Sequence, residues 1–247
     1  PNKCLQMSLL YGRYSQIIGD DFNIYGSYIE NQSFSSHYVV SFQYKLPSTT
    51  VRLESYLKQY SHLPLFEDNK ITLNGKGKSY GVDFFLEDSS ISDNLTTTLS
   101  YSYNHTRRRY LEYVDDVQPQ YATAHNLAVS LKYNIPQIKC ILGLSENIAS
   151  GRPYTNPAEV GKLQYLTKPY FSTGINVSYL ASPSVIIYAS VTNLFDRHNV
   201  FNYNYIKNPG ADSGYIRKSV ESSRDRFFYI GIFISLKKSH AYEISNF

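Results

Sequence analysis

The chain has 247 residues, of which 25 are tyrosine and 13 are phenylalanine, and its formal net charge is +4. This composition excludes disordered and collagen-like chains, and so small a charge does not require a nucleic-acid partner. Two cysteines, Cys4 and Cys140, do not make a disulfide scaffold, and no apolar run approaches the roughly 18 residues of a transmembrane helix.

Apolar and polar residues alternate with a period of two along most of the chain, which predicts β-strands and no helix of useful length. In residues 226–235, Phe228, Ile230, Ile232 and Ile234 lie on one side and more mixed residues lie on the other. About ten strands are predicted in this way. In chain order they occupy residues 6–14, 38–45, 51–60, 80–87, 95–104, 126–133, 138–145, 174–179, 185–192 and 226–235.

The connections between these strands alternate between short and long. Short connections are expected at 46–49, 88–93, 134–137 and 181–184, and long ones near 15–35, 61–78, 105–120, 149–168 and 195–224. Tight turns at one end and large loops at the other are typical of an all-β, antiparallel, up-and-down transmembrane β-barrel. The sequence therefore predicts a barrel in the outer membrane of a Gram-negative cell, with short turns in the periplasm and long loops outside.

A soluble β-sandwich is the alternative fold, because its strands alternate as well. The second face of residues 95–104 is wholly hydroxyl and amide side chains, however, which suit a wet lumen better than a core. We therefore expect Ile230, Ile232 and Ile234 to face lipid. Large groups are expected on the lumen face, namely Arg52, Glu54, Tyr56, Lys58, Tyr188 and Phe233.

Four stretches carry a resemblance to a known family. They are KGKSYGVDFFLED (76–88), LSYSYNHTRRRYL (99–111), ASGRPYTNP (149–157) and VTNLFDRHNVFNYNY (191–205). Together they resemble the C-terminal barrel half of TonB-dependent outer-membrane receptors, most closely those of Bacteroides-type bacteria. The resemblance runs from about residue 5 to about residue 236.

The resemblance implies a 22-stranded barrel closed by an N-terminal plug. It implies a receptor and transporter, not an enzyme, for a scarce ligand such as a metal chelate, cobalamin or a glycan. Its partners would be outer-membrane lipid, TonB through a plug and box that this chain lacks, and an extracellular ligand that the sequence does not specify. Residues 1–236 would form part of the barrel and residues 237–247 an extension after the last strand. No cofactor is expected, and the isolated chain is expected to form an open sheet.

Candidate ligand-binding residues lie where the loops are expected. They are His105, Arg107, Arg108, Arg109, Arg152, Tyr154 and His198. Arg152 has two interpretations: its planar guanidinium could meet an anionic ligand, or it could pair with an acid while Gly151 and Pro153 turn the chain. The histidines lack a metal-ligand spacing, so no metal site is expected.

A second function remains open from the residues alone. Acidic pairs at Asp20–Asp21 and Asp115–Asp116, together with Asp196 and His198, would suit an omptin-like ten-stranded outer-membrane protease in which these groups activate a water molecule. Near the same place, Asn193 and Asp196 are expected to cap the end of a strand through local hydrogen bonds from their side chains to the backbone.

Overall fold

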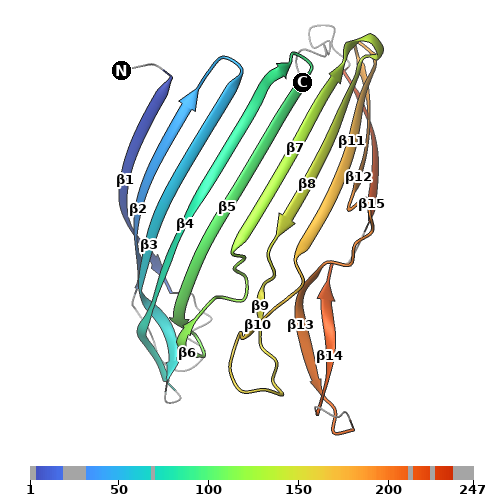
Figure 1. The fold of residues 1–247 in the computed structure, drawn as a ribbon. Helices are drawn as coiled ribbons and strands as arrows, with labels where there is room; N and C mark the ends of the chain where they lie inside the picture. The colour runs from blue at the N-terminus through green and yellow to red at the C-terminus, as the bar shows by residue number, and fades with distance from the viewer. Residues whose placement is uncertain (1–3, 19–31, 68–69, 211–213, 223–225, 236–247) are drawn as a thin grey trace.

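The computed structural model describes residues 4–18, 32–67, 70–210, 214–222 and 226–235. Nearly every element in these ranges is an antiparallel strand (Figure 1), so the all-β prediction is confirmed. One short 3-10 turn, Pro136–Ile138, joins two strands. In the described part of the chain, no helix has the length and apolar character that a membrane crossing would require.

Most of the strands form one large sheet, and along its path each strand is hydrogen-bonded to the next strand of the path. Its path runs through β1 (Leu5–Ile17), β2 (Gln32–Lys45), β3 (Thr49–Glu67), β4 (Lys70–Ser92), β5 (Leu95–Tyr110), β7 (His125–Ile135), β8 (Cys140–Ala149), β11 (Tyr170–Ser182), β12 (Val185–Thr192) and β15 (Phe227–Ile234). The short β6 (Tyr113–Val117) pairs with the far end of β5. All ten predicted strands coincide with strands of this path.

Two small hairpins lie outside the sheet, at the end where the long connections gather (Figure 1). β9 (Pro153–Tyr154) pairs with β10 (Tyr165–Leu166), and β13 (Val200–Lys207) pairs with β14 (Tyr215–Glu221). The tight turns lie at the opposite end of the sheet. The predicted separation from the short turns is therefore present for the long connections after β5, β8 and β12, while most of the connection expected near 15–35 lies outside the described residues.

The connection expected at 61–78 is wrong, because β3 and β4 continue through it as one long hairpin. Register shifts near Ser61 and Leu63, and a left-handed residue at His62 (φ 57°), interrupt the period of two without ending the pairing. A bulge of this kind hides a strand from a pattern search because the side chains change face. For the same reason β4 extends to Ser92, into the turn expected at 88–93.

The strand register joins the apolar side chains of all these strands into one surface, here called the apolar face. Residues directly opposite each other on neighbouring strands share a face, and Leu131, Leu144 and Ile175 form one such row. The middle of the apolar face consists of Met7, Leu9, Val40, Phe42, Leu53, Val82, Phe84, Leu99, Val129, Leu131, Leu142, Leu144, Ile175, Val177, Ile187, Ile230 and Ile232.

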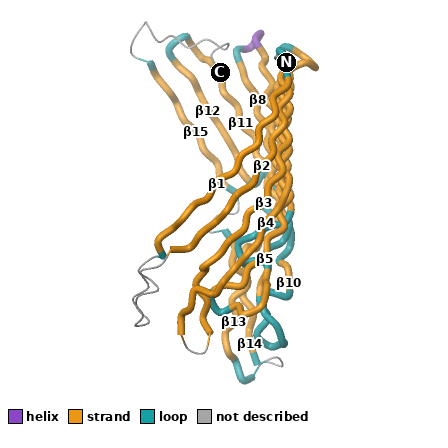
Figure 2. Tube along the Cα trace, turned by 90° about the vertical axis from the view of Figure 1, so that its left-hand side faces the viewer, coloured by secondary structure: helices purple, strands orange, loops and turns teal. Residues whose placement is uncertain are grey.

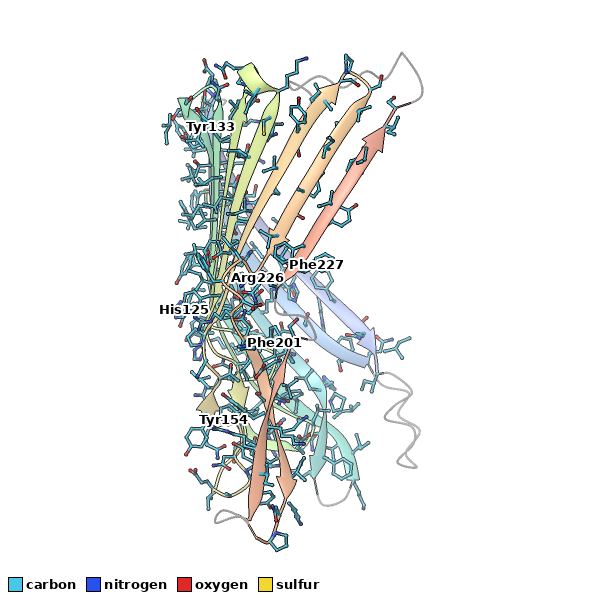
Figure 3. The ribbon with its side chains drawn as sticks, turned by 90° about the vertical axis from the view of Figure 1, so that its right-hand side faces the viewer. His125, Tyr133, Tyr154, Phe201, Arg226 and Phe227 are labelled. Atoms are coloured by element: carbon cyan, nitrogen blue, oxygen red, sulfur yellow. The ribbon has the colours of Figure 1, made fainter. Side chains whose placement is uncertain are left out.

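Aromatic residues bound the apolar face at both ends. Tyr44, Tyr133 and Tyr179 lie toward the turns, and Tyr11, Tyr38, Tyr80, Tyr103, His105 and His125 lie toward the loops. Tyr133 and His125 mark the two ends of β7 on the convex side of the sheet (Figure 3). Apolar bands flanked by aromatic girdles are characteristic of the outer surface of membrane β-barrels.

The opposite surface, here called the polar face, lines the inside of a curved trough (Figure 2). Hydroxyl, amide and charged side chains alternate there with a few large rings, and Arg52 lies 3.6 Å from Glu54. Gly81 lies on this face where a Cβ would come within 2.0 Å of the Tyr103 carbonyl oxygen and 2.6 Å of the Tyr56 hydroxyl. Only glycine lets the Tyr56 ring lie flat against the sheet.

The sheet does not close on itself in the described residues. β1 pairs only with β2, and β15 pairs only with β12. The described sheet therefore has two long edges, and the expectation that the isolated chain forms an open or poorly closed sheet stays a prediction.

Candidate ligand-binding rim

The loop end of the polar face is covered by three connections, at 111–124, 150–169 and 193–226. Tyr154 and Phe201, from the second and third of these, lie toward the loop end of the sheet (Figure 3). Among the hollows that these connections and the strand ends beneath them form, two have similar chemistry.

The first hollow has a volume of about 300 Å³ and lies over β5, β7 and β8. Its floor consists of the polar-face residues Ser100, Ser102, Asn126 and Asn147, and its cover includes Arg152, Lys168, Tyr170 and Phe201. Cations and rings above a floor of hydroxyls and amides can bind an anionic or polyhydroxylated molecule.

Arg152 is held at this hollow by its own backbone. Its N–H donates to the Thr167 hydroxyl and its carbonyl accepts from the Thr167 N–H, both at 2.9 Å. Gly151 makes this approach possible, because a Cβ there would lie 2.0 Å from the Thr167 carbonyl oxygen. The Arg152 guanidinium lies 5.2 Å from the centre of the Phe201 ring. This cation–π contact is the described contact of the Arg152 side chain, and no ion pair between Arg152 and an acid is found among the described residues.

Tyr154 is buried and packs against Tyr203 at 4.7 Å and Tyr165 at 5.7 Å between ring centres. It ties the β9–β10 hairpin to the β13–β14 hairpin. Burial, and after it the neighbouring Tyr154, raises the pKa of Tyr205 in the same cluster. The Tyr205 phenol therefore stays protonated at neutral pH and can donate a hydrogen bond.

The second hollow has a volume of about 600 Å³ and lies over the loop ends of β1 to β5. Tyr14, Tyr60, Arg108 and Tyr110 point into it from the polar face. The Arg108 guanidinium lies 4.2 Å from the Tyr60 ring centre, and its buried Nε has no hydrogen-bond partner in the described structure. A buried donor without a partner costs about 1–3 kcal/mol, so a ligand oxygen at this point would relieve that cost.

Strand alternation separates the three consecutive arginines. Arg107 and Arg109 point away from the hollow that Arg108 enters. Arg107 donates to the Asp116 carbonyl at 2.9 Å, and Arg109 forms a 2.8 Å ion pair with Glu67. His105 lies with them on the apolar face and stacks on Tyr80 at 4.9 Å. The sequence cluster therefore contributes one residue, Arg108, to the polar face.

His198 and Asp196, the acid–histidine pair of the protease alternative, contact different partners. His198 lies 3.6 Å from Glu221, and Asp196 lies 3.6 Å from Arg226. Asp20 and Asp21 lie outside the described residues. Among the residues that the structure describes, no three His, Cys, Asp or Glu side chains gather closely enough to hold a metal ion.

Two asparagines fix the connection after β12. The Asn193 side chain accepts from the Arg197 N–H at 3.1 Å and donates to its carbonyl at 2.9 Å, so Asn193 caps the strand end as expected. Asp196 does not share this role, since its described side-chain contact is with Arg226. Asn199, which the sequence did not single out, brackets Phe171 by accepting from its N–H at 3.1 Å and donating to its carbonyl at 2.8 Å.

The substitution Asn199→Ala is expected to loosen the cover of the first hollow. It removes both hydrogen bonds to Phe171 and leaves buried backbone groups unpaired, at about 1–3 kcal/mol. Limited proteolysis of the folded protein should then cut faster within residues 193–226. Asn204→Ala, at an exposed position of β13, serves as the control and should leave the cleavage rate unchanged.

Comparison with known proteins gives matches to solved structures alone, since no family model and no curated protein matches this sequence. The ferric-catecholate import receptor Fiu from K12 E. coli matches with a TM-score of 0.70 at 12% identity over 94% of this chain and 33% of its own. The copper transporter OprC matches with 0.68 at 14% identity, over 93% of this chain and 37% of its own. The outer membrane transporter YddB from Escherichia coli matches with a TM-score of 0.66 at 9% identity, over 94% of this chain and 39% of its own.

These likenesses define the fold. The large antiparallel sheet has the same fold as part of the barrel wall in these outer-membrane structures. The chain spans roughly a third of the length of each of these three structures.

Proposed function

We propose that this chain is the C-terminal part of the barrel of a TonB-dependent outer-membrane receptor, of the kind found in Bacteroides-type bacteria. In this proposal the receptor imports a scarce ligand, and the chain supplies barrel wall and part of the ligand-binding rim. The observation that carries the proposal is the apolar face: it is continuous across the sheet and bounded by aromatic residues at both ends, while the other face is polar. Such a surface is stable against lipid on one side and water on the other.

The proposal places the sheet in a Gram-negative outer membrane, with the tight turns in the periplasm and the hollows facing outside. A plug and a TonB box from elsewhere in the receptor would then close the trough and couple it to TonB. Residues 1–236 would be barrel and residues 237–247 an extension. The membrane location is tested by fractionation: the receptor should sediment with outer membranes and need detergent to leave them. Release by salt alone would contradict it.

The rim supports an anionic or metal-chelate ligand, because each hollow presents an arginine beside aromatic rings. Arg108 with Tyr60 and Arg152 with Phe201 can each bind a carboxylate, phenolate or phosphate oxygen while a ring covers its apolar part. Of the structural neighbours, one is a ferric-catecholate import receptor and another is a copper transporter. We therefore propose a metal chelate ahead of cobalamin or a glycan. His105, Arg107, Arg109, Tyr154 and His198 act in this proposal as supports of the rim, not as direct ligand contacts.

The double substitution Arg108→Gln/Arg152→Gln is expected to weaken binding of that chelate by about tenfold or more, because each arginine offers a charge-assisted hydrogen bond worth about 1.5–3 kcal/mol. The measurement is a titration of the full-length receptor with a panel of ferric catecholates, ferric hydroxamates, copper chelates and cobalamin. Arg52→Gln, which removes the same charge at the turn end of β3 away from both hollows, is the control and should bind as the parent does. No binding of any panel member to the parent would contradict the chelate proposal.

A further inference from the structure

The apolar face carries a second feature beyond its loop-side aromatic residues. Arg13, Lys78 and Arg107 lie on one register row, with Ser36 and Gln59 between them, and Lys76 follows one row further out. These four cations, here called the basic row, are all exposed. They point to the same side as the apolar band and away from the two hollows described above, although Arg107 also lines a third hollow, of about 730 Å³, with Asp115 and Asp116.

The next row toward the turns, beside the basic row, consists of Tyr11, Tyr38, Leu57, Tyr80 and His105. Tyrosines in such a position sit at the boundary between hydrocarbon and headgroups. A cation one row farther out, about 7 Å along a strand, therefore lies at the depth of lipid headgroups. Lys78 lies over the ring of Tyr80 at 5.7 Å, which holds its charge near this boundary, whereas Arg13 lies over the ring of Phe34, one row farther toward the loops, at 5.1 Å.

The charges of the basic row are largely free for an external anion. Arg109, their neighbour, is paired with Glu67, while the described ion pairs include none that engages Lys76 or Lys78. Arg107 donates to a backbone carbonyl, and the exposed acids Asp115 and Asp116 lie on the adjacent β6. The excess of positive charge is therefore greatest at Lys76 and Lys78.

Among the described residues, the turn side of the apolar face shows no such row of cations. The positions on the apolar face that lie one row beyond the turn-side aromatic residues include Thr49, Asp88 and Ile135. The Asp88 carboxylate accepts a hydrogen bond from the Thr49 hydroxyl at 2.5 Å. Cations at one membrane boundary and an acid at the other indicate that the two leaflets present different charges to this sheet.

We propose that the basic row binds the phosphate groups of anionic lipids in the leaflet on the loop side. The inference rests on the membrane location proposed above. Each basic residue near an anionic membrane surface contributes about 1 kcal/mol of attraction, and the serine and glutamine side chains of the same row can donate further hydrogen bonds to phosphate oxygens. The lipid would stay bound along the apolar face of β1 to β5, on the outside of the barrel wall.

The test is native mass spectrometry of the full-length receptor in a neutral detergent, titrated with phosphatidylglycerol or with phosphatidylcholine. The parent should bind phosphatidylglycerol in preference, and Lys76→Gln/Lys78→Gln should weaken that binding by about tenfold or more. Lys58→Gln/Lys132→Gln removes the same charge from the polar face and should leave lipid binding unchanged.

The possible outcomes distinguish failure of the lipid-binding site from failure of the proposed membrane location. Equal binding of both lipids by the parent, equal loss in both double variants, or displacement of the lipid by millimolar inorganic phosphate would overturn the basic row as a lipid site. Failure of the parent to enter detergent micelles or neutral vesicles would instead overturn the membrane location.

Discussion

Val40→Lys is expected to block insertion of the receptor into a bilayer, while Ser41→Lys, one residue along the same strand, is expected to be tolerated. Val40 lies on the apolar face of β2 between Tyr38 and Tyr44, opposite Leu9 and Ser55. A lysine on the lipid side near the midplane of a barrel costs about 2–4 kcal/mol. Ser41 faces the polar side directly opposite Glu54, where a lysine gains an acidic neighbour.

The experiment refolds the full-length receptor and both variants into lipid vesicles and measures the folded fraction from heat-dependent gel mobility. Parent and Ser41→Lys should fold to similar yields, and Val40→Lys to a small fraction of them. The two substitutions add the same side chain to adjacent residues, so the difference reports the face and not the charge. Equal yields from the two variants would show that the apolar face does not meet lipid.

Much of this architecture is predictable because a strand between lipid and water must alternate at every residue. The alternating side chains of residues 95–104 and 226–235 indicate β5 and β15, and in both the structure keeps the predicted faces. The same physics gives the order of the sheet, since tight turns leave neighbouring strands no alternative but to pair. The pattern holds only where both solvents are present.

In the proposed membrane setting, both faces of a strand meet water beyond the aromatic rows, and apolar and polar residues need not alternate there. The loop end of the β3–β4 hairpin was therefore predicted to be a loop, although the backbone pairing of these two strands continues to Glu67 and Lys70. The run of three arginines looked like one cluster, because residue type alone does not reveal that Arg108 and its two neighbours face opposite ways. Asn199 gave no signal, since its hydrogen bonds join residues 28 positions apart. The site is thus defined by tertiary contacts between loops.

The 247-residue chain by itself is expected to form no pore. β1 and β15 each pair on one side only, so each leaves a row of backbone N–H and C=O groups without partners. An unpaired group in hydrocarbon costs several kcal/mol, which excludes an open edge from the lipid-exposed region. Exposure at the edges is correspondingly high: Leu9 and Leu10, on opposite faces of β1, are 71% and 60% exposed, and Ile230 of β15 is 76% exposed.

Closing these strands on themselves would require a narrower barrel. Barrels can form from about eight strands, but only with side chains that fill a narrow interior. The polar face instead carries Arg52, Tyr56, Lys58 and the Tyr188–Tyr229 pair, whose rings lie 5.9 Å apart on neighbouring strands. These groups fit the wide trough and would collide across a small lumen. Edge pairing between chains, which leads to aggregates, is then the more accessible outcome.

Refolding the isolated chain into vesicles should therefore give neither a heat-modifiable band on gels nor single-channel conductance. The receptor containing the remaining strands, refolded in parallel, should give the heat-modifiable band, because its strands satisfy both edges of this sheet. Protease protection of the isolated chain in vesicles would identify any closed species. A protected, heat-modifiable species formed from these 247 residues alone would show that β1 and β15 pair directly, and the open trough would then be a state that closes in lipid.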